Sequence, residues 1–307
     1  LIAVGFSFVF WGLDIGSFSD AWVTSGSSLF TLGFAKPEGG GLIWLTFVEA
    51  TIGLGVVALL ISFLPTLYTA YSAREQGVGM LAPLTGTPAS GAELLWRLHA
   101  AQALAGSGIW SSTSAWFVAM EQSHIAFPAL PQFPPQQEDR SWVATAGAVL
   151  DAAAIALSVA ETDEGQPVGA ATVGGSDRTQ LGGVLVVLAH GSSAIVGVAR
   201  AAGLAVDDPP AVVDLVLGSD HDPGPISVER REYDEALEFL AGAGVIGAVD
   251  AERGWLRFVR IRGSYDTALR GLAGLTHAPP APWTTDRALT VGRPRFFSHK
   301  PVDTREP

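Results

Sequence analysis

The sequence predicts an all-α protein in which a membrane module precedes a helical domain that lies in water. Only five charged residues precede residue 74, although the chain has 18 Lys and Arg and 30 Asp and Glu. Residues 42–68 are almost wholly apolar over about 27 positions, enough for a helix to cross the hydrocarbon core of a bilayer. Beyond residue 86, apolar residues recur at helical spacing. The expected divisions are a membrane module over 1–73, a cytosolic helical domain over 74–279 and an irregular tail over 280–307.

The composition excludes several function classes. The net charge of -12 argues against a nucleic-acid partner, because binding phosphates needs clustered Lys and Arg. Solubility of the second part of the chain is the simpler explanation of that charge. The chain has no Cys, so it has no disulfide, no thiolate metal site and no cysteine nucleophile.

The first apolar segment, residues 1–13, is too short to cross a bilayer, which takes about 20 helical residues. It also lacks the basic start and the small-residue cleavage site of a secretory signal. We expect it to be the last turns of an outer membrane helix that is truncated at residue 1. Trp11 would lie at the level of the lipid headgroups, where amphipathic rings settle.

A short helix is expected next. Residues 17–20, Ser-Phe-Ser-Asp, supply N-cap chemistry, and the helix body over residues 21–30 is only about two to three turns long. Such a helix cannot span a bilayer. It can enter the membrane part of the way, provided that its backbone and the loop after it are enclosed by protein or face water.

The order of these segments resembles the pore module of potassium channels. That order is a short helix, a loop with the sequence Thr-Leu-Gly-Phe-Ala at residues 31–35, and a long apolar span. The corresponding filter of that family reads Thr-Val-Gly-Tyr-Gly. The stretch Val-Glu-Ala-Thr-Ile-Gly-Leu-Gly at residues 48–55 is similar to bacterial members that have two transmembrane helices. The resemblance is confined to the membrane module.

The resemblance implies a role for each residue of the loop. The main-chain carbonyl groups of Thr31, Leu32, Gly33, Phe34 and Ala35 would point inward and replace the hydration shell of an ion. Consecutive residues would then alternate between right-handed and left-handed conformations, and Gly33 can adopt the left-handed one at little cost. The Thr31 hydroxyl would add a ligand at the inner end of this filter.

Residues beside and within the loop modify this expectation. Phe34 stands where an aromatic ring braces the loop against the short helix, and Trp22 is expected to contribute to that brace. Ala35 replaces the second glycine of the family, and a left-handed Ala would cost about 1 to 2 kcal/mol. Lys36 replaces the usual Asp and would place a ring of positive charge at the outer mouth. These two differences leave the selectivity open, with potassium as the expected permeant monovalent cation.

The inner helix of the resemblance would be residues 42–68. Gly53 and Gly55 permit close helix packing or bending, and Pro65 lacks a backbone donor and can kink a helix. All three are therefore candidate gate elements.

Glu49 is the only charged residue in that span. An intramembrane carboxylate marks a functional site by default. We weigh a structural hydrogen bond to Ser27 or Ser28, on the back of the short helix, against direct contact with the ion. The pore loop of the family enters from outside, so the inner helix would run toward the cytoplasm. Arg74, the first basic residue after it, agrees with the positive-inside rule.

Six helices are expected in the cytosolic domain. A Ser-x-x-Glu capping box at residues 90–93 begins the first. The third and fourth are apolar enough to raise the question of further membrane spans. Asp151 and His190 would be costly in lipid, so we expect buried core helices instead. The predicted bounds are 90–98, 110–124, 141–160, 181–202, 227–243 and 250–275, with loops at 164–178 and 217–225.

No catalytic or metal site is expected. Glu121 and His124 have the spacing of carboxylate-bridged metal sites, but such sites need a second pair, so a hydrogen-bonding role is expected. Ser192 lies near His190 without a Gly-x-Ser-x-Gly elbow, and the chain has no Gly-Lys-Ser or Gly-Lys-Thr phosphate loop. A second Thr-Val-Gly-Gly, at residues 172–175, lies in a polar stretch and is expected to be a surface loop.

The sequence therefore predicts a multi-pass protein of the cell membrane that is not an enzyme and has no cofactor. One loop per chain cannot enclose an axial pathway, so the resemblance implies a homotetramer that conducts cations. Its partners would be copies of itself and membrane lipid, and its cytoplasmic domain could bias a gate. The alternative is a non-conducting, membrane-anchored sensor or interaction protein.

Overall fold

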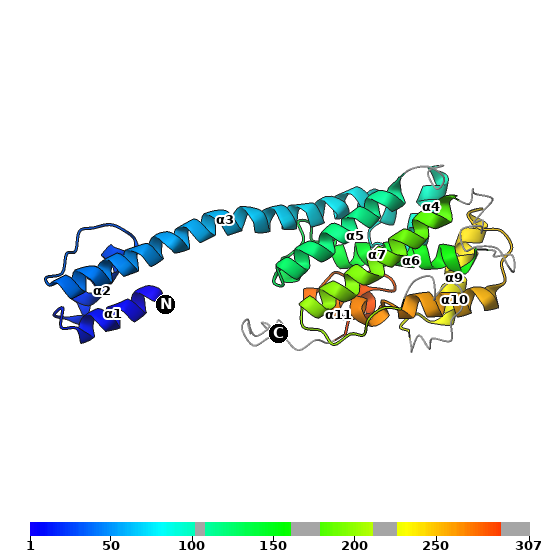
Figure 1. The fold of residues 1–307 in the computed structure, drawn as a ribbon. Coiled ribbons are helices and arrows are strands. Elements are labelled where there is room, and N and C mark those ends of the chain that lie inside the picture. The colour runs from blue at the N-terminus through cyan, green and yellow to red at the C-terminus, as the bar shows by residue number, and fades with distance from the viewer. Residues whose placement is uncertain (102–107, 161–178, 211–225, 290–307) are drawn as a thin grey trace, which may run out of the picture. The chain divides into compact units, whose positions relative to one another are not determined.

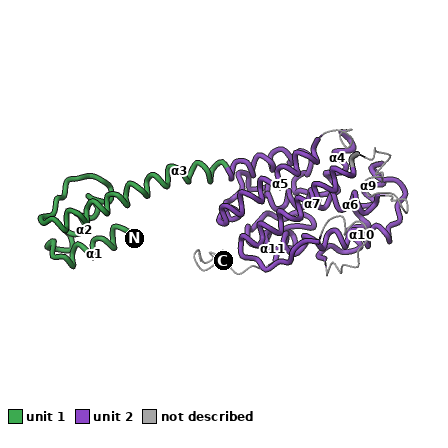
Figure 2. Tube along the Cα trace, viewed as in Figure 1, with its two compact units in different colours: residues 1–69 green, residues 70–307 purple. Residues whose placement is uncertain are grey.

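The computed structural model describes residues 1–101, 108–160, 179–210 and 226–289 of the chain. Within these residues every regular element is a helix and there is no strand, which confirms the predicted all-α class (Figure 1). The chain divides into two compact units, Leu1–Thr69 and Ala70–Pro307 (Figure 2). Helix α3, Gly40–Thr85, contributes its first part to unit 1 and its second part to unit 2.

Unit 1 begins with two short helices that pack against each other. The second is capped within residues 17–20, where N-cap chemistry was predicted: the Ser17 hydroxyl accepts from the Asp20 N–H at 3.2 Å, and the Asp20 carboxylate accepts from the Ser17 N–H at 3.0 Å. This reciprocal box satisfies N–H groups that a helix start leaves free. The rings of Phe8 and Trp11 contact Phe18 across the two helices. The elements of unit 1 are α1, Ile2–Gly12; α2, Phe18–Leu29; and the first part of α3.

Much of the apolar surface of α3 is exposed. Among the described residues, α3 and α7 (Thr179–Ala201) are the two helices long and apolar enough to cross a membrane. In the most apolar window of α3 only 11% of the residues are buried, against 56% in that of α7. Leu54, Leu59 and Ile61 of α3 are each at least 65% exposed. This exposure is compatible with a membrane location, since soluble surfaces rarely present so large an apolar patch.

Unit 2 contains helices at each predicted position. The region predicted as one helix over residues 250–275 is two helices, because Gly263, a poor helix former, ends the first and Tyr265 begins the second. The loops expected at 164–178 and 217–225 lie outside the described residues. The elements are α4, Gly91–Ala100; α5, Ile109–Ala126; η1, Leu130–Gln132; α6, Trp142–Ser158; α7; α9, Arg230–Gly242; α10, Ala251–Gly263; α11, Asp266–Thr276; and η3, Thr285–Arg287.

Helix α6 lies at the centre of unit 2. All of its residues are buried, and it contacts α4, α7, α10 and α11. Small residues allow this close packing: a Cβ added at Gly147 would overlap the Thr284 side chain and lie 3.0 Å from Leu269. Its burial agrees with the core helix expected from the sequence.

Arg74 holds the end of α3 inside unit 2. Its side chain is buried, forms an ion pair with Glu75 at 2.8 Å and donates to the carbonyl oxygens of Leu130 at 3.0 Å and Phe133 at 3.2 Å. The Trp116 indole N–H donates to the Arg74 carbonyl oxygen at 3.2 Å. Arg74, the first basic residue after the apolar span, is therefore also a structural residue of the helical domain.

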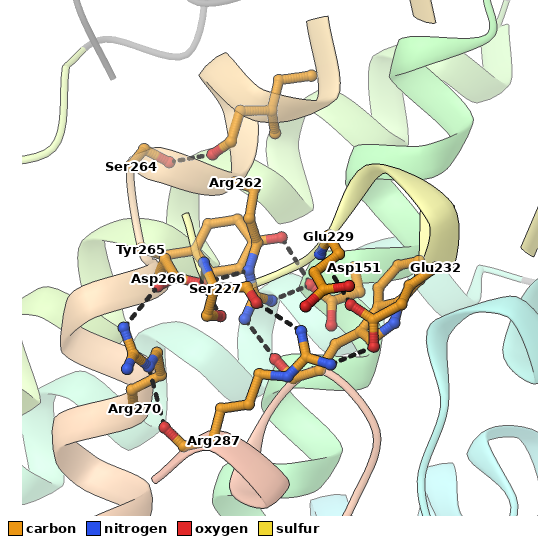
Figure 3. Close-up of polar contacts among 12 residues, drawn as sticks. Asp151, Ser227, Glu229, Glu232, Arg262, Ser264, Tyr265, Asp266, Arg270 and Arg287 are labelled. Carbon is orange, nitrogen blue, oxygen red and sulfur yellow. Dashed lines mark hydrogen bonds and ion pairs between the residues drawn. The ribbon is translucent and has the colours of Figure 1, made fainter. Parts of the chain in front are cut away.

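A buried ionic cluster joins α6, α10 and α11 (Figure 3). Arg262 of α10 is fully buried and forms ion pairs with Asp151 of α6 and, at 2.9 Å, with Asp266 of α11. Tyr265 donates its hydroxyl to Asp151 at 2.9 Å, and Arg262 also donates to the Trp283 carbonyl oxygen. The carboxylate that would be costly in lipid is thus paired inside the protein.

Two buried groups of the helical domain should have opposite effects on stability as pH changes. Burial lowers the pKa of His124 from 6.5 to about 4. Burial also raises the pKa of Asp151 from 3.8 to about 6, because its loss of hydration outweighs the attraction of Arg262. Acid in this range therefore destabilises through His124, which is protonated first in the unfolded chain. It stabilises through Asp151, which is protonated first in the folded chain.

The two groups therefore act in opposite directions in the parent protein. We expect the His124→Phe variant to gain stability relative to the parent as pH falls from about 6.5 to about 4.5. The Asp151→Asn variant should lose stability over the same interval. Thermal unfolding of the full chain in detergent, followed by near-ultraviolet circular dichroism, measures both. Parallel pH curves for the parent and the two variants would contradict this prediction.

Candidate functional site

The first half of the loop at residues 31–35 is tied to the end of α2 through its N–H groups. Thr31 donates to the Ser28 carbonyl oxygen at 2.9 Å. Leu32 and Gly33 donate to the Ser27 carbonyl oxygen at 2.8 and 3.4 Å. The chain therefore folds back over the last turn of α2 as soon as the helix ends.

The Ser27 hydroxyl holds the second half of the loop. Its oxygen accepts from the N–H groups of Phe34 and Ala35, each at 3.1 Å. The Ser27 side chain is buried beneath the loop, with 2% of the residue exposed. All five consecutive N–H groups of the loop are thus bonded to the last turn of α2.

The carbonyl groups of the same loop are left unpaired. Within the part of the chain that the structure describes, no carbonyl oxygen of residues 31–35 accepts a hydrogen bond. Residues 31–34 are exposed and residue 35 is half-buried. Backbone oxygens of this kind must find water or another ligand, and they are the groups that coordinate a dehydrated cation in a filter.

The backbone of the loop alternates in handedness over its first three residues. Thr31 and Gly33 are left-handed, with φ of 54° and 73°, whereas Leu32 between them is not. The strain predicted for Ala35 was wrong, since Ala35 has no positive φ. The strain falls on Thr31, where a left-handed, β-branched residue costs about 1 to 2 kcal/mol. The Thr31 hydroxyl donates to the preceding carbonyl oxygen at 2.7 Å.

Glu49 faces α2 as predicted, but its partner is Ser25 and not Ser27 or Ser28. Glu49 is fully buried, and its Oε1 accepts from the Ser25 hydroxyl. Ser27 is unavailable because it holds the loop, and Ser28 donates to a carbonyl oxygen of its own helix at 2.9 Å. The Ser25 hydroxyl is also 3.0 Å from the Ala3 carbonyl oxygen, so one side chain links α1, α2 and α3.

The second carboxylate oxygen of Glu49, Oε2, is buried and has no hydrogen-bond partner among the described residues. The sequence analysis predicted correctly that Glu49 faces α2, because a buried carboxylate needs a polar partner. It missed Ser25, although Ser25 and Ser28 are three residues apart and therefore share a face of α2, while Ser27 does not.

The expected aromatic brace is not formed within one chain. Trp22 is 48% exposed and Phe34 is 67% exposed. No ring contact joins the two in the described part of the chain. Lys36, directly after the loop, is exposed as well. Both rings are therefore available to a neighbouring molecule.

The three candidate gate positions have different surroundings. Gly53 is buried against the last residue of α2, where an added Cβ would overlap the Leu29 carbonyl oxygen and lie 2.9 Å from its carbon. Gly55 has nothing within 4 Å of the same point. Pro65 lies inside α3, which continues to Thr85. Within one copy of the chain, Gly53 therefore packs against the end of α2, whereas Gly55 does not.

Replacing Ser27 by Ala should loosen the loop. The change removes the acceptor of two N–H groups, each bond contributing about 1 kcal/mol. Amide hydrogen exchange of the segment over residues 31–38, measured by mass spectrometry on the protein in detergent, should become about 30-fold faster. The matched control is Ser28→Ala, since the Ser28 hydroxyl bonds only within its own helix. Equal exchange in the two variants would mean that Ser27 does not hold the loop.

Glu121 and His124 are used in hydrogen bonds. His124 Nδ1 lies 2.7 Å from the Met120 carbonyl oxygen, and Glu121 accepts from the Ser193 hydroxyl at 3.3 Å. No group of three or more His, Asp and Glu side chains in the described residues could hold a metal ion. The second Thr-Val-Gly-Gly, at residues 172–175, lies outside the described residues.

Comparisons with protein families, with curated proteins and with solved structures gave no match to this chain. A function must therefore be inferred from the loop at residues 31–35 and the side chains that hold it.

Proposed function

We propose that residues 1–69 supply one subunit of a tetrameric cation pore and that the loop at residues 31–35 is its filter. The hydrogen bonding of the loop carries this proposal: its five N–H groups are bonded to α2, and its five carbonyl oxygens accept no hydrogen bond from a described residue. A backbone held in this way presents acceptors and no donors. Such a surface favours a cation over an anion.

Four copies are needed because a single loop encloses no axial pathway. The exposed apolar side chains of α3 suit contact with lipid and with neighbouring copies. The exposed rings of Trp22 and Phe34 would complete the aromatic brace across a subunit boundary. The partners in this proposal are copies of the same chain and membrane lipid.

The permeant ion in this proposal is a monovalent cation, and the resemblance of the loop favours potassium. Ala35 and Lys36 set the pore apart from strictly selective members of that family. The protein would lie in the cell membrane as a multi-pass protein with its helical domain in the cytoplasm. Because Arg74 holds the end of α3 in that domain, movement of the domain would reach the pore through α3.

The second candidate function is that of a non-conducting, membrane-anchored sensor or interaction protein. The exposed Lys36 favours it, because four such charges around one mouth would repel cations. In that case the helical domain would be the functional part.

Ion flux separates the two proposals. Liposomes that contain the purified protein should take up potassium, and Gly33→Ala should abolish the flux or alter the permeability ratio of potassium to sodium. The reason is backbone conformation, because Gly33 has a φ of 73° and open space around its Cβ position. Gly41→Ala is the control, since Gly41 also has open space but no positive φ.

Three results would contradict the proposal that residues 31–35 are the filter of a tetrameric cation channel. They are a lack of flux for every monovalent cation, an unchanged permeability ratio in Gly33→Ala, and a monomeric mass in detergent. The first would leave the sensor as the supported function. The second would show that residues 31–35 are not the filter.

A further inference from the structure

A pocket of about 500 Å³ lies in unit 2 between α4, α9 and the segment before η3. This volume is in the range of small-molecule sites, which combine apolar walls with a few polar groups. The pocket is built from residues 90–283 only, so it does not include the loop at residues 31–35. Its chemistry stands independently of the proposed channel.

One wall of the pocket is aromatic. Trp96 of α4 and Phe239 of α9 line it, with ring centroids 6.1 Å apart and ring planes inclined at 66°. They are 38% and 47% exposed, which is unusual for large aromatic side chains in a folded domain. Trp283 lines the pocket as a third ring. These rings offer faces for the apolar body of a ligand and for a cation above it.

Among the described residues, the charged side chains that line the pocket are all carboxylates, and no Lys, Arg or His is among them. Glu232 is engaged at both oxygens, by Arg287 and by the Glu229 N–H. Glu93 forms an ion pair with Arg97. These two acids have partners within the protein and contribute little free charge.

Each of the other two carboxylates keeps an oxygen that accepts no hydrogen bond from a described residue. Glu235 meets Arg231 only at 3.8 Å, and its side chain is 64% exposed. Asp151 is 1% exposed, and its Oδ1 accepts from Arg262 and Tyr265. Its second oxygen, Oδ2, accepts no hydrogen bond in the described part of the chain, although Asp151 lines the pocket.

We propose that this pocket binds a small organic ammonium ion that carries an apolar body. The ammonium group is held by the exposed carboxylate of Glu235, and the body packs against Trp96 and Phe239. Anions are disfavoured because the charged side chains that line the pocket, among the described residues, are all acidic. A bare metal ion is disfavoured, because an aromatic wall supplies no oxygen ligands.

The test is calorimetric titration of the full chain, in non-ionic detergent micelles, with 2-phenylethylammonium. The same titration into empty micelles corrects for partitioning. Saturable binding is expected, whereas the neutral 2-phenylethanol should bind more weakly and the anionic phenylacetate should not bind. Glu235→Gln should weaken ammonium binding about fivefold, as expected for loss of one exposed ion pair. Trp96→Leu should weaken it two- to fivefold through loss of the ring face.

The matched control is Glu238→Gln, an exposed carboxylate of the same helix that does not line the pocket. Its affinity for the ammonium should equal that of the parent. Melting temperatures close to that of the parent establish that the three variants are folded. No saturable ammonium binding, equal binding of phenylacetate, or equal weakening in Glu235→Gln and Glu238→Gln would overturn the proposal.

Discussion

The Gly53→Ala variant should not assemble a conducting pore. An added Cβ would overlap the Leu29 carbonyl oxygen and lie 2.9 Å from its carbon, and these backbone atoms cannot turn away as a flexible side chain could. Helix α3 would have to move off the end of α2, at a cost of about 3 kcal/mol or more. Glu49, one turn earlier, would then lose its bond to Ser25. The loop at residues 31–35 would lose the support on which its shape depends.

Gly55→Ala is a close control for this prediction. The two glycines are two residues apart in one helix, and a Cβ at Gly55 has nothing within 4 Å. The substitution should be tolerated, and the better helix propensity of Ala favours it by about 1 kcal/mol. Potassium flux in liposomes and the mass in detergent measure both variants. Normal flux and assembly in Gly53→Ala would show that the contact with Leu29 is dispensable, while a loss in Gly55→Ala alone would identify Gly55 as a bending point.

Patterns that act over a few residues made part of this fold predictable. The apolar run over residues 42–68 predicted the middle of α3, and the Ser-Phe-Ser-Asp segment at residues 17–20 predicted a helix start, with a body from residue 21 where α2 begins at Phe18. These signals depend on neighbours in the sequence, so they need no knowledge of the fold. The left-handed Gly33 was predictable for the same reason, because the side chain itself determines that freedom.

Partners distant in the sequence were not predictable. Asp151 and Arg262 are 111 residues apart, and nothing local indicates that they meet. The roles of the serines in α2 were not predictable for the same reason, although these residues are close together in the sequence. Ser25, Ser27 and Ser28 are chemically alike, and only the paths of α3 and of the loop decide which hydroxyl meets Glu49 and which holds the backbone.

The Arg262→Met variant should strongly destabilise the helical domain. Methionine fills much of the volume of the side chain but leaves Asp151 buried without its cation and Asp266 with only the more distant Arg270. Breaking a buried ion pair by removing one partner costs about 3 to 5 kcal/mol, mostly from the charge left behind. For a domain of this size we expect a fall of about 10 °C in the unfolding temperature. Near-ultraviolet circular dichroism of the full chain in detergent follows the transition.

Arg270→Met is the control for Arg262→Met, because Arg270 contacts the same Asp266 from a more exposed position. Its side chain is 28% exposed and lies 3.5 Å from Asp266, so Arg270→Met should cost no more than about 1 kcal/mol. Adding Asp151→Asn and Asp266→Asn to Arg262→Met should restore part of the lost stability, because the uncompensated charges are then removed. If Arg262→Met unfolded at the parent temperature, the cluster would not hold α6, α10 and α11 together. If the triple variant were no more stable than Arg262→Met, lost packing and not buried charge would explain the effect.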